Sequence, residues 1–168
     1  MPEEIINRVA KSKLVTLNLE EHYPKGARYE LDIKDWLYEG LILREKEFRA
    51  HADAHDWSQY DQGYLAMRCT GDAIVPGWAY MLLATKAQPF AKKTVQGTLT
   101  DLENSLFQEV IQQLDVAPYQ NRPVIIKGCS QKPVPPNAYL WLAQKLVPVA
   151  KSIMYGEACS SVPLYKRK

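Results

Sequence analysis

Three cysteines are the residues of this sequence best suited to chemistry: Cys69, Cys129 and Cys159. Each follows a stretch that predicts a β-strand, and Asp72 lies three residues after the first of them. Thiolates are soft ligands for zinc, iron and iron–sulfur clusters, and a carboxylate can complete such a ligand set. These residue types therefore predict a site that holds iron, an iron–sulfur cluster or zinc through Cys69, Cys129, Cys159 and Asp72.

Two other interpretations of the cysteines stay open. A thiol activated by a helix N-terminus or a nearby lysine can accept or transfer sulfur or electrons, and Lys127 and Lys132 flank Cys129. This pattern would suit a small thiol-dependent enzyme that uses Cys129. Cysteine is also a small residue that is often buried, so the three could instead fill the core of a structural or interaction module. Their spacing matches no zinc finger or ferredoxin, and whether the chain is an enzyme is left open.

Other motifs give weaker chemical signals. His51 and His55 are four positions apart, which places both on one face of a predicted helix and makes them a candidate metal pair. We prefer the interpretation that they favour the negative end of the helix dipole, because no third ligand follows at matching spacing. The segment GCSQKPVPP lacks the glycines of a phosphate-binding loop, and the GxSxG motif of serine hydrolases is absent.

A repeat organises the elements that must position these residues. Residues 75–97 return without a gap 59 positions later as residues 134–156, and 11 of the 23 aligned positions are identical. We call this offset the repeat interval. Phe48, Asp56 and Tyr60 recur at the repeat interval as Phe107, Asp115 and Tyr119. The sequence therefore predicts an internal duplication, with repeats at about 43–97 and 102–156.

Each repeat is predicted to contain a helix, a loop, a strand, a cysteine-bearing loop, a second helix and a second strand. The predicted strands are 64–69 and 92–97 in the first repeat and 123–129 and 151–156 in the second. Pro76 and Pro135 can open the second helices, and Pro89 and Pro148 end them. Aligning Cys69 with Cys129 requires a one-residue insertion between Tyr119 and Val134, with a compensating deletion in the loops.

The remaining segments are predicted from periodicity and turn residues. Residues 3–10 are weakly helical, residues 14–19 alternate as a strand, and residues 20–28 form a loop. Asp32 caps a helix that ends near His51 to His55, and a helix over 102–114 is capped by Thr100 or Asp101. The last ten residues contain a short strand.

Strands that alternate with helices indicate an α/β fold with parallel pairing and right-handed crossovers. We predict one domain over residues 1–168: a Rossmann-like three-layer sandwich around a mainly parallel sheet, with pseudo-two-fold symmetry between the repeats. Ligands of such sheets bind beyond the carboxyl ends of the strands. The repeat then places all three cysteines at one edge of that sheet.

Composition limits the classes of function. The chain has 168 residues, of which 46% are hydrophobic, and its net charge of +2 is too small for the concentrated basic face of a nucleic-acid binder. No apolar run is long enough for a membrane span, and the start MPEEIINRV is acidic, unlike a secretion signal. We therefore expect a cytoplasmic protein that binds neither nucleic acid nor a membrane.

The segments IKDWLYEGLILREKEF, VIIKGCSQKPVP and GEACSSVPLYKRK carry a family resemblance. With them, the chain resembles an uncharacterised bacterial family, domain of unknown function number 2480, over nearly its whole length. Genes of that family tend to lie beside those of sulfur-mobilising iron–sulfur cluster assembly. The resemblance thus implies an accessory factor in iron–sulfur or metal homeostasis with a protein partner from that system, and it brings no catalytic residue or cofactor.

Overall fold

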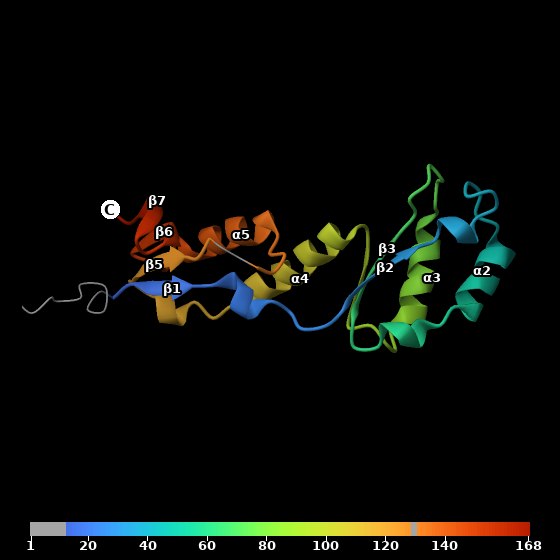
Figure 1. Ribbon diagram of the computed structural model, residues 1–168, viewed down its shortest axis with the longest axis horizontal. Coiled ribbons are helices and arrows are strands. Elements are labelled where there is room, and N and C mark those ends of the chain that lie inside the picture. The colour runs from blue at the N-terminus through green and yellow to red at the C-terminus, as the bar shows by residue number, and fades with distance from the viewer. Residues whose placement is uncertain (1–12, 129–130) are drawn as a thin grey trace, which may run out of the picture. The chain divides into compact units, whose positions relative to one another are not determined.

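The strands and helices of the chain divide into two units (Figure 1). The structure is a computed structural model that describes residues 13–128 and 131–168. Unit 1 combines the N-terminal part of the chain up to Tyr23 with Phe107–Lys168, and unit 2 is Pro24–Leu106. Unit 2 is therefore inserted in the sequence of unit 1.

Unit 2 contains a parallel sheet of three strands in the order β2-β3-β4. Its elements, in chain order, are β2 (Arg28–Asp32), η2 (Lys34–Trp36), α2 (Glu45–Ala54), η3 (Trp57–Tyr60), β3 (Tyr64–Arg68), α3 (Gly77–Ala87) and β4 (Lys93–Gln96). Strand β3 is almost entirely buried because it is central and covered on both faces. Consecutive parallel strands in this order are what right-handed helical crossovers produce.

Alternate residues of β3 pack into different clusters. Leu65 and Met67 contact the cluster that contains α2 and α3, whose buried residues include Phe48 and Ala79. Tyr64 and Ala66 point to the other face, where they pack with the start of α4 (Leu99–Gln113) through Leu102 and Leu106. Helices thus cover both faces of this sheet.

Unit 1 has a four-stranded sheet in the order β1-β5-β6-β7. Its elements are β1 (Val15–Leu17), η1 (Leu19–His22), the later part of α4, η4 (Ala117–Tyr119), β5 (Pro123–Ile126), α5 (Pro136–Leu146), β6 (Ser152–Glu157) and β7 (Ser160–Lys166). Strands β1, β5 and β6 are parallel, and β7 returns antiparallel to β6. Helices α4 and α5 contribute four buried residues to the core of this unit: Phe107, Ile111, Leu142 and Leu146.

The registers of the two sheets follow the repeat interval. Leu65 pairs with Thr94 in unit 2, and Val124 pairs with Ile153 in unit 1. Helices α3 and α5 also begin and end at the repeat interval. The first strand of each unit, β1 or β2, does not follow the repeat interval. Tyr29 pairs with Leu65 and Val15 with Val124, so β1 and β2 are equivalent at a much shorter interval and both precede the repeated elements.

Four expectations from the sequence need correction. The strands form two sheets instead of one sheet. Strand β2 occupies the end of a predicted loop and the residues after it. The helix expected from Asp32 onward is a single 3-10 turn, and α2 begins only at Glu45. The expected insertion is not needed, because the repeat interval is constant from the strands to Val75 and Val134, so Cys69 aligns with Gly128 and Thr70 with Cys129.

Several expectations are confirmed. Strands lie at 15–17, 64–68, 93–96, 123–126 and 152–157, and a last strand at 160–166. Pro76 and Pro135 directly precede helices α3 and α5, which end before Pro89 and Pro148. The cap expected at Thr100 or Asp101 is wrong, because α4 begins at Leu99. Thr98 caps the helix: its Oγ1 atom accepts from the Asp101 N–H at 3.2 Å, and the Asp101 carboxylate accepts from the Thr98 N–H at 2.7 Å. The helix predicted over residues 3–10 lies outside the described residues.

Candidate functional site

The predicted cysteine ligands lie in different parts of the chain. Cys69 follows β3 of unit 2 and is partly buried, whereas Cys159 is exposed in the turn between β6 and β7 of unit 1. Cys129 lies outside the described residues. Asp72 is exposed on the same loop as Cys69. Within residues 13–128 and 131–168, no three histidine, cysteine or acidic side chains gather as a metal site.

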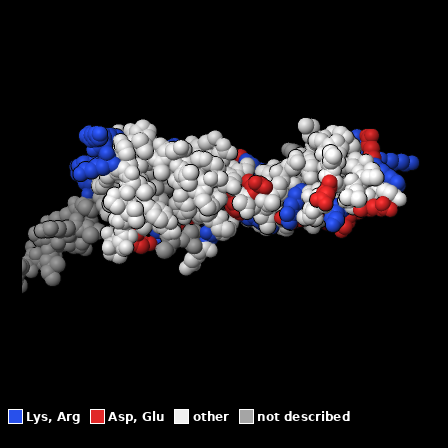
Figure 2. Space-filling view, turned by 90° about the horizontal axis from the view of Figure 1, so that it is seen from above, with Lys and Arg blue, Asp and Glu red and all other residues white. Residues whose placement is uncertain are grey.

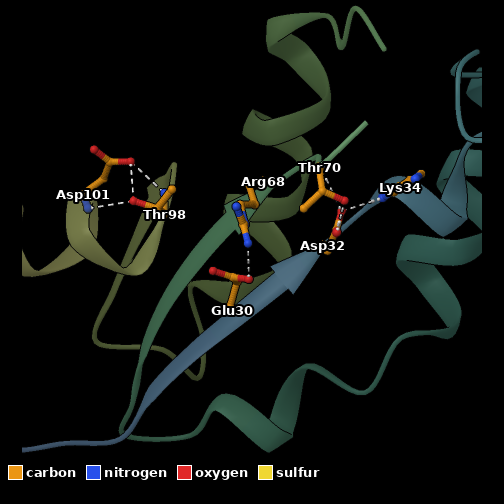
Figure 3. A network of polar contacts seen from close by, with 7 residues as sticks. All are labelled: Glu30, Asp32, Lys34, Arg68, Thr70, Thr98 and Asp101. Atoms are coloured by element: carbon orange, nitrogen blue, oxygen red, sulfur yellow. Dashed lines mark hydrogen bonds and ion pairs between the residues drawn. The ribbon is translucent and has the colours of Figure 1, made fainter. Parts of the chain in front are cut away.

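A polar network joins the carboxyl ends of β2 and β3 (Figure 3). Asp32 ends β2, and its carboxylate accepts hydrogen bonds from the backbone N–H of Lys34 at 3.0 Å and of Thr70 at 3.2 Å. The Thr70 hydroxyl donates to the same carboxylate at 2.5 Å. Asp32 thus starts the turn η2 and ties the loop after β3 to it.

The titration of this edge follows from these contacts. Burial alone would raise the pKa of Asp32, but the hydrogen bonds from Thr70 and Lys34 and the charge of Arg68 outweigh it, so the pKa is lowered. Burial, and then the nearby Cys69 and Asp32, raise the pKa of the Tyr80 hydroxyl. Asp32 is therefore an ionised, hydrogen-bonded carboxylate, which suits a structural anchor better than a proton acceptor.

An ion pair joins β2 and β3 close to this edge. Arg68 on β3 donates from its Nη2 to the Glu30 carboxylate on β2 at 2.9 Å. The Arg68 Nε atom is buried and has no hydrogen-bond partner among the described residues. Because the rest of the side chain is partly exposed, the pair contributes only a small stabilisation.

Apolar side chains are exposed at this same end of unit 2. We define the apolar rim as the exposed residues of the loop before α2, the loop before α3 and the first turns of α3: Tyr38, Leu41, Ile42, Ile74, Trp78 and Met81. Ile74 is 93% exposed and Met81 is 71% exposed. Both loops follow the carboxyl ends of strands, and α2 and α3 begin there, so all six residues belong to one end of unit 2.

Direct contacts hold the parts of the apolar rim together. A Cβ placed on Gly71 would come within 3.2 Å of the Gly40 carbonyl oxygen, so the two loops touch. The Trp78 ring lies 5.9 Å from the ring of Phe48 on α2. The guanidinium of Arg44 lies 3.4 Å from the centre of the Tyr38 ring, and that of Arg49 lies 5.4 Å from the Trp78 ring. Contacts between the two loops and α2 therefore hold residues of the apolar rim in place.

Aromatic packing explains the histidine pair. His51 stacks on Trp36 with ring centres 5.8 Å apart, and His55 meets the same ring edge-on at 5.2 Å. The His55 Nε2 atom and the Tyr60 hydroxyl are 2.8 Å apart. Burial lowers the pKa of His55, while Asp56 acts in the opposite direction. Both histidines therefore belong to an aromatic cluster, which sequence spacing alone did not reveal.

On the face drawn in Figure 2, charged side chains form small groups, of which the one at the left consists of Lys and Arg. At the right of the same view, Lys and Arg side chains lie beside Asp and Glu side chains, and most of the face is uncharged. Arg44 pairs with Glu47 at 3.5 Å and Arg49 with Glu45 at 3.0 Å. None of the helices in the described part of the chain combines the length and apolar content of a membrane span.

Comparison with known proteins identifies the family of the chain. No curated protein and no solved structure matches it significantly. A family model described as a protein of unknown function, DUF2480, matches residues 3–167. The resemblance carried by the sequence segments is thereby confirmed, and it covers nearly the whole chain. The chain with this two-unit α/β structure therefore belongs to the DUF2480 family.

Proposed function

We propose that the chain is an interaction module that binds a partner protein through the apolar rim of unit 2. The observation that carries this proposal is the exposure of six apolar side chains at one end of the unit. Monomeric proteins seldom expose apolar side chains in such a group unless they bind something there. The Asp32 carboxylate at this end accepts three hydrogen bonds from Lys34 and Thr70, which suits a structural support for a binding surface.

The residue types of the apolar rim favour a protein as the partner. Tyrosine, tryptophan, methionine and arginine are enriched in protein interfaces, and Trp78 and Tyr38 each lie under an arginine. A membrane surface would instead call for a surplus of basic residues around the apolar side chains. Here Arg44 and Arg49 are both paired with glutamates of α2.

Site-specific photo-crosslinking in cells tests this function. A photoreactive amino acid at Ile74 should give a discrete adduct with one other protein, and Leu41→Asp should abolish that adduct. The same photoreactive residue at Leu140, which is also exposed but lies on α5 of unit 1, is the matched control. Absence of an adduct at Ile74, an equal adduct at both positions, or an adduct of two copies of this chain would contradict the proposal.

A metal role for Cys69, Cys129, Cys159 and Asp72 is a second proposal, and it would make the protein an accessory factor of iron–sulfur or metal homeostasis. It is supported by Cys69 and Asp72, which share one loop at the carboxyl end of β3. Protein purified without oxygen should then carry iron or zinc, and each Cys→Ser change should lower the content. Metal-free protein would end this proposal.

The thiol-dependent alternative makes a different prediction. If Cys129 acts as a nucleophile, its thiol should titrate below the ordinary value of about 8.5 and react faster with a thiol reagent than Cys159. Exposed Cys159 is the internal reference. Equal rates at the two thiols would argue against a specialised role for Cys129.

We also propose that the two units arose by duplication and are Rossmann-like, related by a rotation close to two-fold. Support comes from the repeat interval, which the strand registers and the helix bounds share. Equivalent core positions also agree, since Phe48 and Phe107 are both fully buried. An experimental structure in which residues 56–97 and 115–156 do not superpose would overturn the duplication.

A further inference from the structure

Unit 1 has a pocket of about 300 Å³ on its surface. It is lined by His22, Val110, Gln113, Leu114 and Asp115. These residues come from the last position of η1, the C-terminal part of α4 and the segment that directly follows α4. Its volume is at the lower end of the range of roughly 300 to 1,000 Å³ that is typical of small-molecule sites.

The corresponding place in unit 2 is found through the strand registers. Val15 and Tyr29 pair with equivalent residues of β5 and β3, so β1 and η1 correspond to β2 and η2 at the offset between Val15 and Tyr29. The turns agree in detail: the Asn18 side chain accepts from the Glu20 N–H at 3.1 Å, as Asp32 does from Lys34 at 3.0 Å. His22 therefore occupies the position of Trp36.

The other wall of the pocket corresponds to the histidine pair. At the repeat interval, Val110 takes the position of His51 and Leu114 that of His55. In unit 2, the Trp36 ring is parallel to His51 within 9° and touches His55 edge-on. The indole of Trp36 thus fills the space against these two side chains. In unit 1 the Tyr23 ring makes with Phe107 the contact that Trp36 makes with Phe48, and the equivalents of Trp36, His51 and His55 line a pocket.

We propose that this pocket binds a planar aromatic group of indole size, packed against Val110 and Leu114 as Trp36 packs against His51 and His55 in unit 2. Val110 and Leu114 are apolar walls on which such a ring can pack. His22, Gln113 and Asp115 stand around the ring as hydrogen-bonding groups. The ring can belong to a free heteroaromatic molecule or to a tryptophan side chain of another protein.

Charge near the pocket selects between ring types. Asp115 accepts a hydrogen bond from the Ala117 N–H at 3.0 Å, which leaves its second carboxylate oxygen for another donor. Burial, Glu21 and Asp115 together raise the pKa of the neighbouring Tyr119. Carboxylates on this side favour a ring that donates an N–H over a ring that carries an anionic group.

Titration with indole, followed by amide chemical shifts of the labelled full-length protein, tests the site. Indole should shift the amides of His22, Val110 and Leu114 and should leave those of α2 and α3 unchanged. Uncharged N-acetyl-tryptophanamide is the second probe. Binding of indole alone assigns the pocket to a free small molecule, and binding of both assigns it to a side chain as well. No saturable shift with either probe would overturn the proposal.

Substitutions that fill the pocket test the proposal most directly. His22→Trp restores the residue found at the unit 2 position and should weaken indole binding at least about tenfold. Val110→Phe narrows the same pocket and gives a second variant if His22→Trp does not fold. Gln144→Trp, which adds an indole at an exposed position of α5 outside the pocket, should bind indole like the wild type. Undiminished binding by a folded His22→Trp or Val110→Phe protein would refute the assignment.

Discussion

Asp32 fixes the backbone of two segments, the turn after β2 and the loop after β3. Its carboxylate holds the N–H groups of Lys34 and Thr70, so one side chain fixes the turn after β2 and the loop after β3. Asp32→Ala should lower the free energy of unfolding at pH 7 by about 1 to 2 kcal/mol, because these donors lose their partner. Urea denaturation measures this difference, and exposed Asp35→Ala is the control, with an effect within about 0.5 kcal/mol.

The pH dependence of this difference provides a stricter test. The pKa of Asp32 in the folded protein lies below its ordinary value of 3.8. The unfolded chain therefore binds the proton first as the pH falls, and the stabilisation present above pH 3.8 is lost below it. The wild type and Asp32→Ala should converge in stability in that range. A difference that stays constant down to the lowest pH would show that the ionised carboxylate is not responsible.

His55 should make stability depend on pH in the same direction near neutrality. Burial lowers its pKa from the ordinary 6.5, so in the window below 6.5 the unfolded chain binds a proton that the folded protein does not. The free energy of unfolding should fall as the pH drops through this window. His55→Gln should remove this component of the slope in denaturation curves between about pH 5 and 8. His51→Gln, at the exposed neighbour, should retain it.

Residue types alone could predict candidate ligands but not which residues lie next to them in the fold. The sequence placed Cys69 and Cys159 at strand ends, and both do follow strands. It could not place them in different sheets, because strand pairing depends on contacts far apart in the chain. Trp36 illustrates the same limit, since only the fold brings it against His51 and His55.

At the scale of elements, periodicity predicted the helices that have a repeated partner and misjudged the segment that lacks one. The apolar spacing from Ile33 to Phe48 is helical, yet the chain forms one 3-10 turn and a small bridge between Tyr38 and Ile42. Glu39 and Gly40 adopt positive φ angles of 52° and 70°, which interrupt a helix. Ile33, Leu37 and Phe48 of this segment are buried, whereas Leu41 and Ile42 are exposed, so the apolar spacing did not correspond to one buried helix face.

Helix packing on the sheet of unit 1 gives a prediction at this scale. Ala138 on α5 has no exposed surface and packs in the core with Leu142 and Val124. Ala138→Leu should overpack this site and lower the free energy of unfolding by about 1 to 3 kcal/mol, measured by the denaturation midpoint. Leu140→Ala on the same helix is the control: this side chain is 60% exposed, so the midpoint should hardly change. An unchanged midpoint for Ala138→Leu would mean that the core can accommodate the larger side chain.

For the whole molecule, the repeat predicted two similar sets of elements but not how the first strands join them. Both β1 and β2 precede the repeated elements, and β1 pairs with β5 across residues 15 to 124 while β2 pairs with nearby β3. No local signal distinguishes these pairings, because both strands are short alternating segments. The nested order follows from the three-dimensional pairing only.

Refolding should reflect this nested order. All strand pairs of unit 2 lie within residues 28–96, whereas unit 1 must close the long connection between β1 and β5. Closing a longer loop costs more chain entropy and slows pairing. Pulsed hydrogen exchange during refolding should therefore protect the amides of β3 before those of β1. Earlier protection of Val15 to Leu17 would contradict this order.

The nesting also has a consequence for synthesis of the chain. When the ribosome releases β1, its partner β5 has still to be made, because unit 2 and α4 lie between them. At about 5 to 20 residues per second, the delay is roughly 5 to 20 s. During this time Leu17 and Leu19, which are buried in the finished protein, have no core to enter, whereas all three strands of unit 2 are made before β5. In the nascent chain, β1 thus has no strand to pair with until β5 has been made.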